Sequence, residues 1–135
     1  MTNQTVEERK KKLVADMSQE RGYMPPSFTY MVEKDIDFIE AYNNLYTRGL
    51  AVGNALPIKT RELVAIAILA YRGLTDAVYE HSKRALRNGL TKQELMEAVE
   101  TMIIPGGAPT FATGLSALLR IEEEEKKNAA QASDR

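Results

Sequence analysis

The chain of 135 residues contains no cysteine and no tryptophan, and it has a single histidine, His81. Without cysteine the protein can form neither disulfides nor thiolate zinc sites, and it has no thiol nucleophile. Reactions that proceed by thiol–disulfide exchange are excluded, because that exchange requires sulfur. One histidine cannot make a histidine-rich cluster, so we expect no tightly bound metal.

An excess of charge of either sign is also missing. Lysine and arginine number 18 and aspartate and glutamate number 19, which gives a formal net charge of −1. A chain with so little net charge has no long-range field to attract polyanions. We therefore expect neither nucleic acid nor a membrane surface among its partners.

Long hydrophobic runs are absent as well. The longest, Leu63 to Tyr71, has nine residues, whereas a membrane-spanning helix needs about 20. Residues 1–12 are polar and charged and lack the apolar core of a secretory signal. These features predict a cytoplasmic protein.

The hydrophobic pattern is helical throughout, and no stretch shows the sustained alternation that is typical of strands. We predict an all-α fold, a bundle of about six helices forming a single domain over residues 1–121. Residues 22–26, Gly-Tyr-Met-Pro-Pro, are expected to be a linker after the first helix, because proline lacks the amide donor. The charged residues 122–135 are expected to be a disordered C-terminal tail.

Several residues mark helix boundaries. Thr5 with Glu8, and Thr91 with Glu94, have the spacing of capping boxes. The pattern predicts helices over 59–71, 75–88 and 91–104. Pro-Gly-Gly-Ala-Pro at 105–109 is expected to interrupt the last of these before a final helix.

The predicted helix over 59–71 is apolar on nearly every side beyond Arg61 and Glu62. A domain with about five other helices has difficulty enclosing such an element. A second subunit is a plausible cover, so we predict a homo-oligomer.

His81 is the one side chain whose ordinary titration range lies near neutrality. On its helix it shares a face with Val78 and Ala85, so it is expected to point inward and to need a polar partner. Arg84 is expected on another side of that helix. A core histidine satisfied by a hydrogen bond and a catalytic histidine both fit this pattern.

Glu62 lies near the start of the apolar helix, beside Ala65, Ile66 and Leu69. A buried glutamate there would suit a proton donor or acceptor, but a glutamate in a first turn also gains simply from the helix dipole. The neighbouring Arg61 could bind an anion or merely be solvated. We predict His81, Glu62 and Arg61 as candidate catalytic residues.

Two stretches, Lys-Thr-Arg-Glu-Leu-Val-Ala-Ile-Ala at 59–67 and His-Ser-Lys-Arg-Ala-Leu-Arg-Asn-Gly-Leu-Thr at 81–91, resemble the carboxymuconolactone decarboxylase and alkyl hydroperoxidase D-like family. Gly-Ala-Pro at 107–109 adds to the resemblance. It implies an alkyl hydroperoxidase D-like fold that assembles as trimers or hexamers. The peroxidase branch carries two cysteines just before the histidine, and here those positions look like Leu74 and Ala77.

The resemblance therefore implies the cysteine-free decarboxylase branch, which removes carbon dioxide from a carboxylated lactone and reprotonates the enolate without any cofactor. In that branch His81 would orient or deliver a proton and Glu62 would set its protonation state. Arg61 or a backbone amide would stabilise developing negative charge. A peroxiredoxin activity would not fit the absence of cysteine.

Two hypotheses follow. The first is a cofactor-independent enzyme that acts on a small carboxylated or lactone-like molecule in a pocket between subunits. The second is a non-catalytic oligomeric scaffold or small-ligand binder that lost the peroxidase cysteines, with His81 merely hydrogen-bonded in the core. The enzyme hypothesis requires Glu62 and His81 to approach within hydrogen-bond or one-water reach beside a cavity that solvent can enter.

Overall fold

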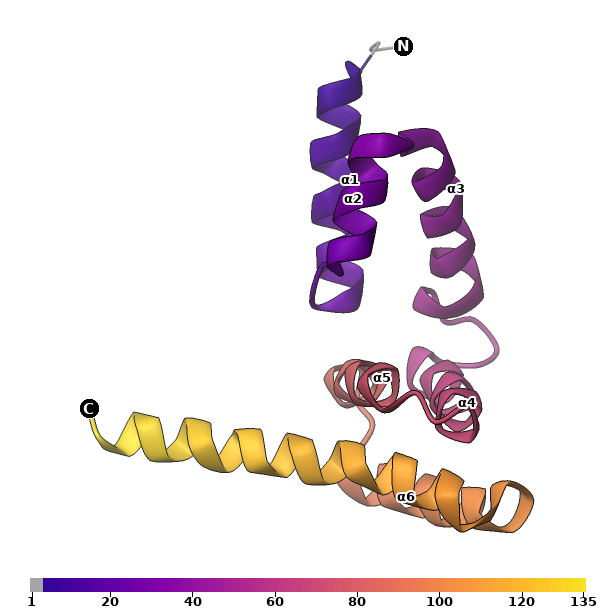
Figure 1. Ribbon diagram of the computed structural model, residues 1–135, viewed down its shortest axis with the longest axis vertical. Helices are drawn as coiled ribbons and strands as arrows, with labels where there is room; N and C mark the ends of the chain where they lie inside the picture. The colour runs from indigo at the N-terminus through magenta and orange to yellow at the C-terminus, as the bar shows by residue number, and fades with distance from the viewer. Residues whose placement is uncertain (1–3) are drawn as a thin grey trace. The chain divides into compact units, whose positions relative to one another are not determined.

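The computed structural model describes residues 4–135, and these residues form helices without any strand (Figure 1). The all-α fold of about six helices is thus confirmed. Six α-helices and one short π-helical turn, η1, follow one another along the chain: α1 (Val6–Arg21), α2 (Pro26–Lys34), α3 (Ile36–Tyr46), η1 (Thr47–Ala51), α4 (Ile58–Tyr71), α5 (Thr75–Arg87) and α6 (Lys92–Ser133).

The contacts within the chain divide it into two compact units, Met1–Gly53 and Asn54–Arg135. The sequence predicted one domain over residues 1–121, and no sequence signal at Gly53 announced this division. The first unit holds α1, α2, α3 and η1, and the second holds α4, α5 and α6.

The first unit is built on capped helices. The Thr5 amide donates to Glu8 Oε2 at 2.8 Å and the Glu8 amide donates to Thr5 Oγ1 at 3.2 Å, which is the predicted capping box. The predicted linker follows α1, although Pro26 already begins α2, where its missing amide donor costs nothing. Buried apolar side chains from α1, α2 and α3 form one core: Leu13, Met17, Val32 and Ile39.

The second unit has a larger core, to which α4, α5 and α6 all contribute. Every fourth residue of α4, namely Glu62, Ile66 and Ala70, is buried, so one face of this helix points into the unit. Val78 and Ala85 do the same for α5, and both are 0% exposed. Tyr79 of α5 donates its hydroxyl proton to Glu124 of α6, and burial raises the pKa of that hydroxyl.

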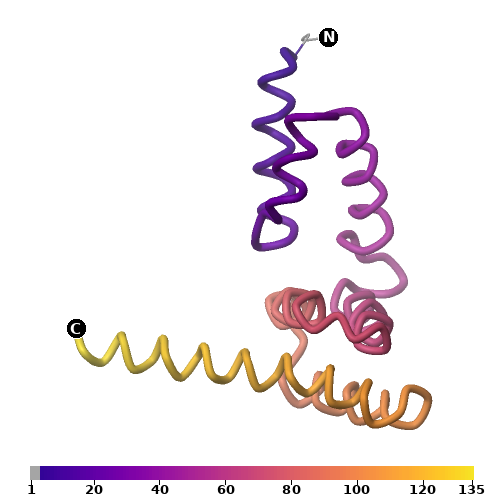
Figure 2. Tube along the Cα trace, in the orientation of Figure 1, coloured from indigo at the N-terminus to yellow at the C-terminus, as the bar shows by residue number. Residues whose placement is uncertain are grey.

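Helix α6 is a hairpin of two helical arms rather than one straight rod. Gly107 has φ 80° and ψ 175°, which is not helical, and Figure 2 shows the orange part of the chain reversing there. Lys92 forms an ion pair with Glu125, 33 residues further along, whereas a straight helix would separate them by about 50 Å. The interruption predicted at residues 105–109 is therefore confirmed.

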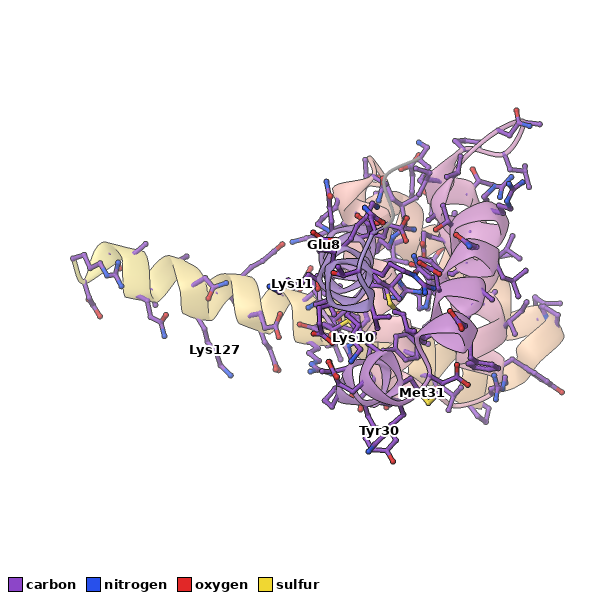
Figure 3. All side chains as sticks on the ribbon, turned by 90° about the horizontal axis from the view of Figure 1, so that it is seen from above. Glu8, Lys10, Lys11, Tyr30, Met31 and Lys127 are labelled. Carbon is purple, nitrogen blue, oxygen red and sulfur yellow. The ribbon has the colours of Figure 1, made fainter. Side chains whose placement is uncertain are left out.

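The predicted disordered tail is instead part of a helix, because α6 continues through Ser133. Glutamate, lysine, alanine and glutamine, which dominate this segment, are strong helix formers. Tyr79 and Lys92 also hold Glu124 and Glu125 at its start. Beyond them the side chains are exposed, and Figure 3 shows Lys127 on the projecting end of the helix.

By length and composition α6 is a helix that could cross a membrane. Core helices of soluble proteins share that property, and α6 buries Leu95, Val99 and Met102 in the core of the second unit. The reversal at Gly107 also means that its 42 residues do not form a single straight span.

We expect Gly107→Ala to destabilise the protein by about 1–3 kcal/mol, because its φ and ψ lie in a region that is essentially restricted to glycine. The added Cβ would lie 3.7 Å from Pro109 Cδ, an ordinary contact, so the cost comes from the backbone. Urea unfolding followed by circular dichroism measures it. The control is Gly49→Ala in η1, whose Cβ would meet nothing within 4 Å. It should leave the free energy of unfolding unchanged or raise it by up to about 1 kcal/mol, because alanine is favoured over glycine in helical backbone. Equal stability of the two variants would contradict the prediction.

Candidate active site

Glu62 is a fully buried carboxylate, 0% exposed, in the second turn of α4. Pro57, whose backbone is extended, precedes α4, and the helix starts at Ile58. Glu62 shares the inward face of the helix with Ile66 and Ala70, because these residues are four positions apart. A buried charge is costly unless it is paired and hydrogen-bonded. The partners of Glu62 therefore decide what it can do.

His81 provides the first partner. Its Nδ1 lies 2.7 Å from Glu62 Oε2, across the interface between α5 and α4. The inward direction and the polar partner expected for this histidine are both present. Its side chain keeps 24% of its surface exposed, so the ring reaches the edge of the packed region.

Arg84 provides the second partner, and here the expectation was wrong. Its guanidinium Nη1 donates to Glu62 Oε1, and its side chain is only 6% exposed. Residues three apart on a helix are neighbours on its surface, so Arg84 lies on the same side of α5 as His81. The spacing of His81 and Arg84 was visible in the sequence. The sequence did not show, however, that a buried carboxylate lies close enough to pair with Arg84.

The three side chains form a cluster in which each carboxylate oxygen of Glu62 has its own partner. Arginine is permanently charged, so it balances the negative charge of the carboxylate. A carboxylate that holds one ring nitrogen of a histidine orients the ring and leaves the other nitrogen for proton transfer. The cluster is therefore suited to moving a proton.

Arg61, the third predicted site residue, points to a different neighbour. Its Nε donates to the Leu56 carbonyl oxygen at 3.3 Å, which ties the start of α4 to the loop before it. The cation that contacts Glu62 in the cluster described above is thus Arg84. Leu74 and Ala77, which look like the cysteine positions of the peroxidase branch, lie at the start of α5, before His81.

A cavity of about 250 Å³ opens farther along α4. No charged side chain lines it; its walls come from the second half of α4 and from the reversal of α6, at Ala67, Ile68, Tyr71, Met102, Pro105, Gly106 and Thr110. Neither Glu62 nor His81 is among these lining residues. In the described part of the chain no group of three or more histidine, aspartate or glutamate side chains is placed to hold a metal ion.

The chain is similar to known proteins in both sequence and structure. The model of the carboxymuconolactone decarboxylase family matches residues 37–120, which include α4, α5 and the whole cluster. The chain also resembles the crystal structure of a protein from Burkholderia xenovorans LB400 whose assignment as a carboxymuconolactone decarboxylase is provisional. That likeness has a TM-score of 0.76 and 27% sequence identity, and it covers 94% of this chain and 98% of the other.

Two similar proteins come from an archaeon and a bacterium. An uncharacterized protein of Methanocaldococcus jannaschii is 28% identical over 100 residues, which are 73% of this chain and 92% of the relative. An uncharacterized protein of Cupriavidus necator is 36% identical over 55 residues, which are 41% of this chain and 49% of the relative.

We expect Glu62→Met to lower the free energy of unfolding by about 3–5 kcal/mol, because it leaves the buried Arg84 guanidinium without its carboxylate. The double variant Glu62→Met/Arg84→Met should recover much of that loss, since no buried charge is then left unpaired. Urea unfolding of both variants measures the difference.

The matched control is an exposed ion pair of the same unit. Asp76, whose side chain is 94% exposed, pairs with Arg120 at 3.0 Å, so Asp76→Asn should change stability by less than about 1 kcal/mol. A Glu62→Met protein as stable as the Asp76→Asn protein would show that the buried cluster does not act as described.

Proposed function

The chain belongs to the carboxymuconolactone decarboxylase family, and from that premise we propose that it is a cofactor-independent enzyme acting on a small carboxylated, lactone-like substrate. The observation that supports this most is the contact of 2.7 Å between Glu62 Oε2 and His81 Nδ1. It couples a fully buried carboxylate to a partly exposed imidazole, which is the arrangement of a proton-transfer pair.

The proposed reaction has two steps. First, the bond between a ring carbon and the substrate carboxylate breaks, carbon dioxide leaves, and the electron pair of that bond passes into an enolate. Second, protonated His81 delivers its Nε2 proton to the enolate carbon, so that hydrogen replaces the carboxylate. Glu62 stabilises the imidazolium before the transfer, and the imidazole regains its proton from solvent.

Arg61 keeps its place in this proposal as the group that stabilises negative charge on the enolate. The hydrogen bond from its Nε to the Leu56 carbonyl oxygen, which helps to fix the guanidinium near the start of α4, supports this role. The guanidinium is permanently charged, which suits it to an anionic substrate.

The second candidate is a non-catalytic scaffold or small-ligand binder. The ion pair of Arg84 with Glu62 supports it, because a purely structural buried carboxylate would need the same partner. The apolar cavity beside Tyr71 and Gly106, which Glu62 and His81 do not line, supports it as well. Turnover separates the two candidates.

We further propose that the chain forms a homo-oligomer, and the family resemblance suggests a trimer or a hexamer. The support is the outward face of α4, where Val64, Ile68 and Tyr71 are 54%, 57% and 72% exposed. These residues stand at i, i+4 and i+7, so they form one apolar stripe on the helix surface. A stripe of this kind is typical of an interface.

We expect purified protein to decarboxylate carboxymuconolactone or a related lactone in an ultraviolet assay, and His81→Asn to lower kcat by about 10²–10⁴-fold through loss of the proton donor. Glu62→Gln should lower it as well. The control is Lys83→Gln on the same helix, whose ammonium pairs with Glu80 instead and whose turnover should match that of the unmodified protein. Folded His81→Asn protein with full turnover would refute the assignment, and wild-type protein inactive on every lactone tested would favour the non-catalytic candidate.

We expect Ile68→Glu to reduce the mass measured by light scattering in solution, because a carboxylate on the apolar stripe of α4 would be buried at the interface. Lys127→Glu is the control, since Lys127 is exposed on the projecting end of α6. A monomeric wild-type protein would contradict the proposal, as would an Ile68→Glu protein that is folded and has unchanged mass.

A further inference from the structure

We propose that Arg84 is a positioning residue: by pairing with Oε1 of Glu62 it keeps this carboxylate ionised and leaves Oε2 to accept a proton from Nδ1 of His81. The neutral imidazole then carries its hydrogen on Nδ1, and Nε2 becomes the atom that exchanges protons with a substrate. The catalytic meaning of this inference rests on the proposed function, but the position of the hydrogen does not.

The burial of Glu62 limits how its negative charge can be stabilised. Its side chain has no exposed surface, so water cannot stabilise the negative charge. If His81 were the sole partner of Glu62, the two side chains could share one proton in either of two arrangements. Either the carboxylate accepts from Nδ1–H, or a carboxylic acid donates to Nδ1 and the imidazole carries its hydrogen on Nε2. A pair that shares one proton in this way titrates as a unit.

Arg84 favours the first of these two arrangements, in which the carboxylate accepts from Nδ1–H. Its guanidinium contacts Oε1, the oxygen that His81 does not use, and only 6% of its side chain is exposed. Arginine has donors but no acceptor and does not lose its proton in proteins. A neutral carboxylic acid at Glu62 would lose the attraction of this fixed positive charge. Arg84 therefore favours the carboxylate form of Glu62.

The consequence for the imidazole follows from its hydrogen-bond partners. An ionised carboxylate only accepts, so the nitrogen that faces it must be the one that carries hydrogen. That nitrogen is Nδ1, at 2.7 Å from Oε2. Nε2 is then the basic nitrogen of the neutral ring, on a side chain that retains 24% of its surface exposed.

The experiment uses the fact that His81 is the one histidine of the chain. Long-range 1H–15N correlation spectra of uniformly 15N-labelled full-length protein therefore contain a single imidazole pattern, which shows directly which nitrogen carries hydrogen. The spectra are recorded at about pH 8.5, well above the ordinary titration range of histidine. We expect the Nδ1–H pattern in the wild-type protein.

Arg84→Met is the decisive variant, because it removes the charge and keeps an unbranched apolar side chain of similar length. The fraction of the Nδ1–H neutral form should fall by more than about twofold, with the neutral Nε2–H form in its place, because Glu62 can then hold the shared proton as a carboxylic acid. Arg84→Lys, which retains the charge, should preserve the Nδ1–H form. Arg87→Met is the matched control: it removes an exposed arginine from the same helix and should leave the imidazole pattern unchanged.

Three results would overturn the inference. They are a wild-type neutral ring with hydrogen on Nε2, an Arg84→Met protein in which Nδ1 keeps its hydrogen in either a neutral or a doubly protonated ring, and a folded Arg84→Lys protein that has lost the Nδ1–H pattern. The wild-type spectrum and the Arg84→Lys spectrum decide the matter even where Arg84→Met does not fold.

Turnover measured on the same samples distinguishes this inference from the proposed function. A wild-type protein with the Nδ1–H pattern, an altered pattern in Arg84→Met and no turnover on lactones supports the positioning role and removes the catalytic one. Turnover by a protein whose Arg84→Met variant keeps the wild-type pattern and the wild-type rate removes the positioning role and supports the catalytic one.

Discussion

The fully buried carboxylate of Glu62 is the constraint on which the second unit depends. A negative charge without exposed surface has to be matched inside the protein, and here α5 supplies both partners, His81 and Arg84, to the two oxygens. The match fixes how α5 lies against α4, because neither partner can shift along its helix without leaving an oxygen unpaired. Glu62 therefore contacts two different groups of α5: the buried guanidinium of Arg84, and the imidazole of His81 at the edge of the packed region.

The absence of cysteine gives this cluster its significance. In the peroxidase branch of the family, the histidine follows two thiols, whereas Leu74 and Ala77 look like the corresponding positions here and carry no reactive group. What remains near His81 is a carboxylate and a guanidinium, which can hold and move a proton but cannot exchange a disulfide. The side chains present therefore fit acid–base chemistry and exclude a thiol-based reaction.

The start, the reversal and the length of helix α6 depend on both local sequence signals and long-range contacts. The capping box of Thr91 with Glu94 starts the helix as the local sequence indicated, and Gly107 reverses it within the interruption predicted at residues 105–109. Its continuation through Ser133 was not expected, because a run of charged residues without an apolar face resembles a solvated tail. Tyr79 and Lys92 hold the beginning of that run through Glu124 and Glu125, and its strong helix formers extend the helix beyond them.

The sequence by itself determined the helical class, most helix boundaries and the exclusion of thiol chemistry, because these depend on residue type and on spacing within a few positions. It also identified Glu62 and His81, since each is a polar residue on an apolar face. Only the tertiary structure decided that these two side chains meet, that Arg84 and not Arg61 is the cation seen on Glu62, and that the contacts divide at Gly53. The reason is physical: the pairing of a buried charge depends on how two helices are rotated against each other, and that rotation is set by the packing of their faces and not by either helix alone.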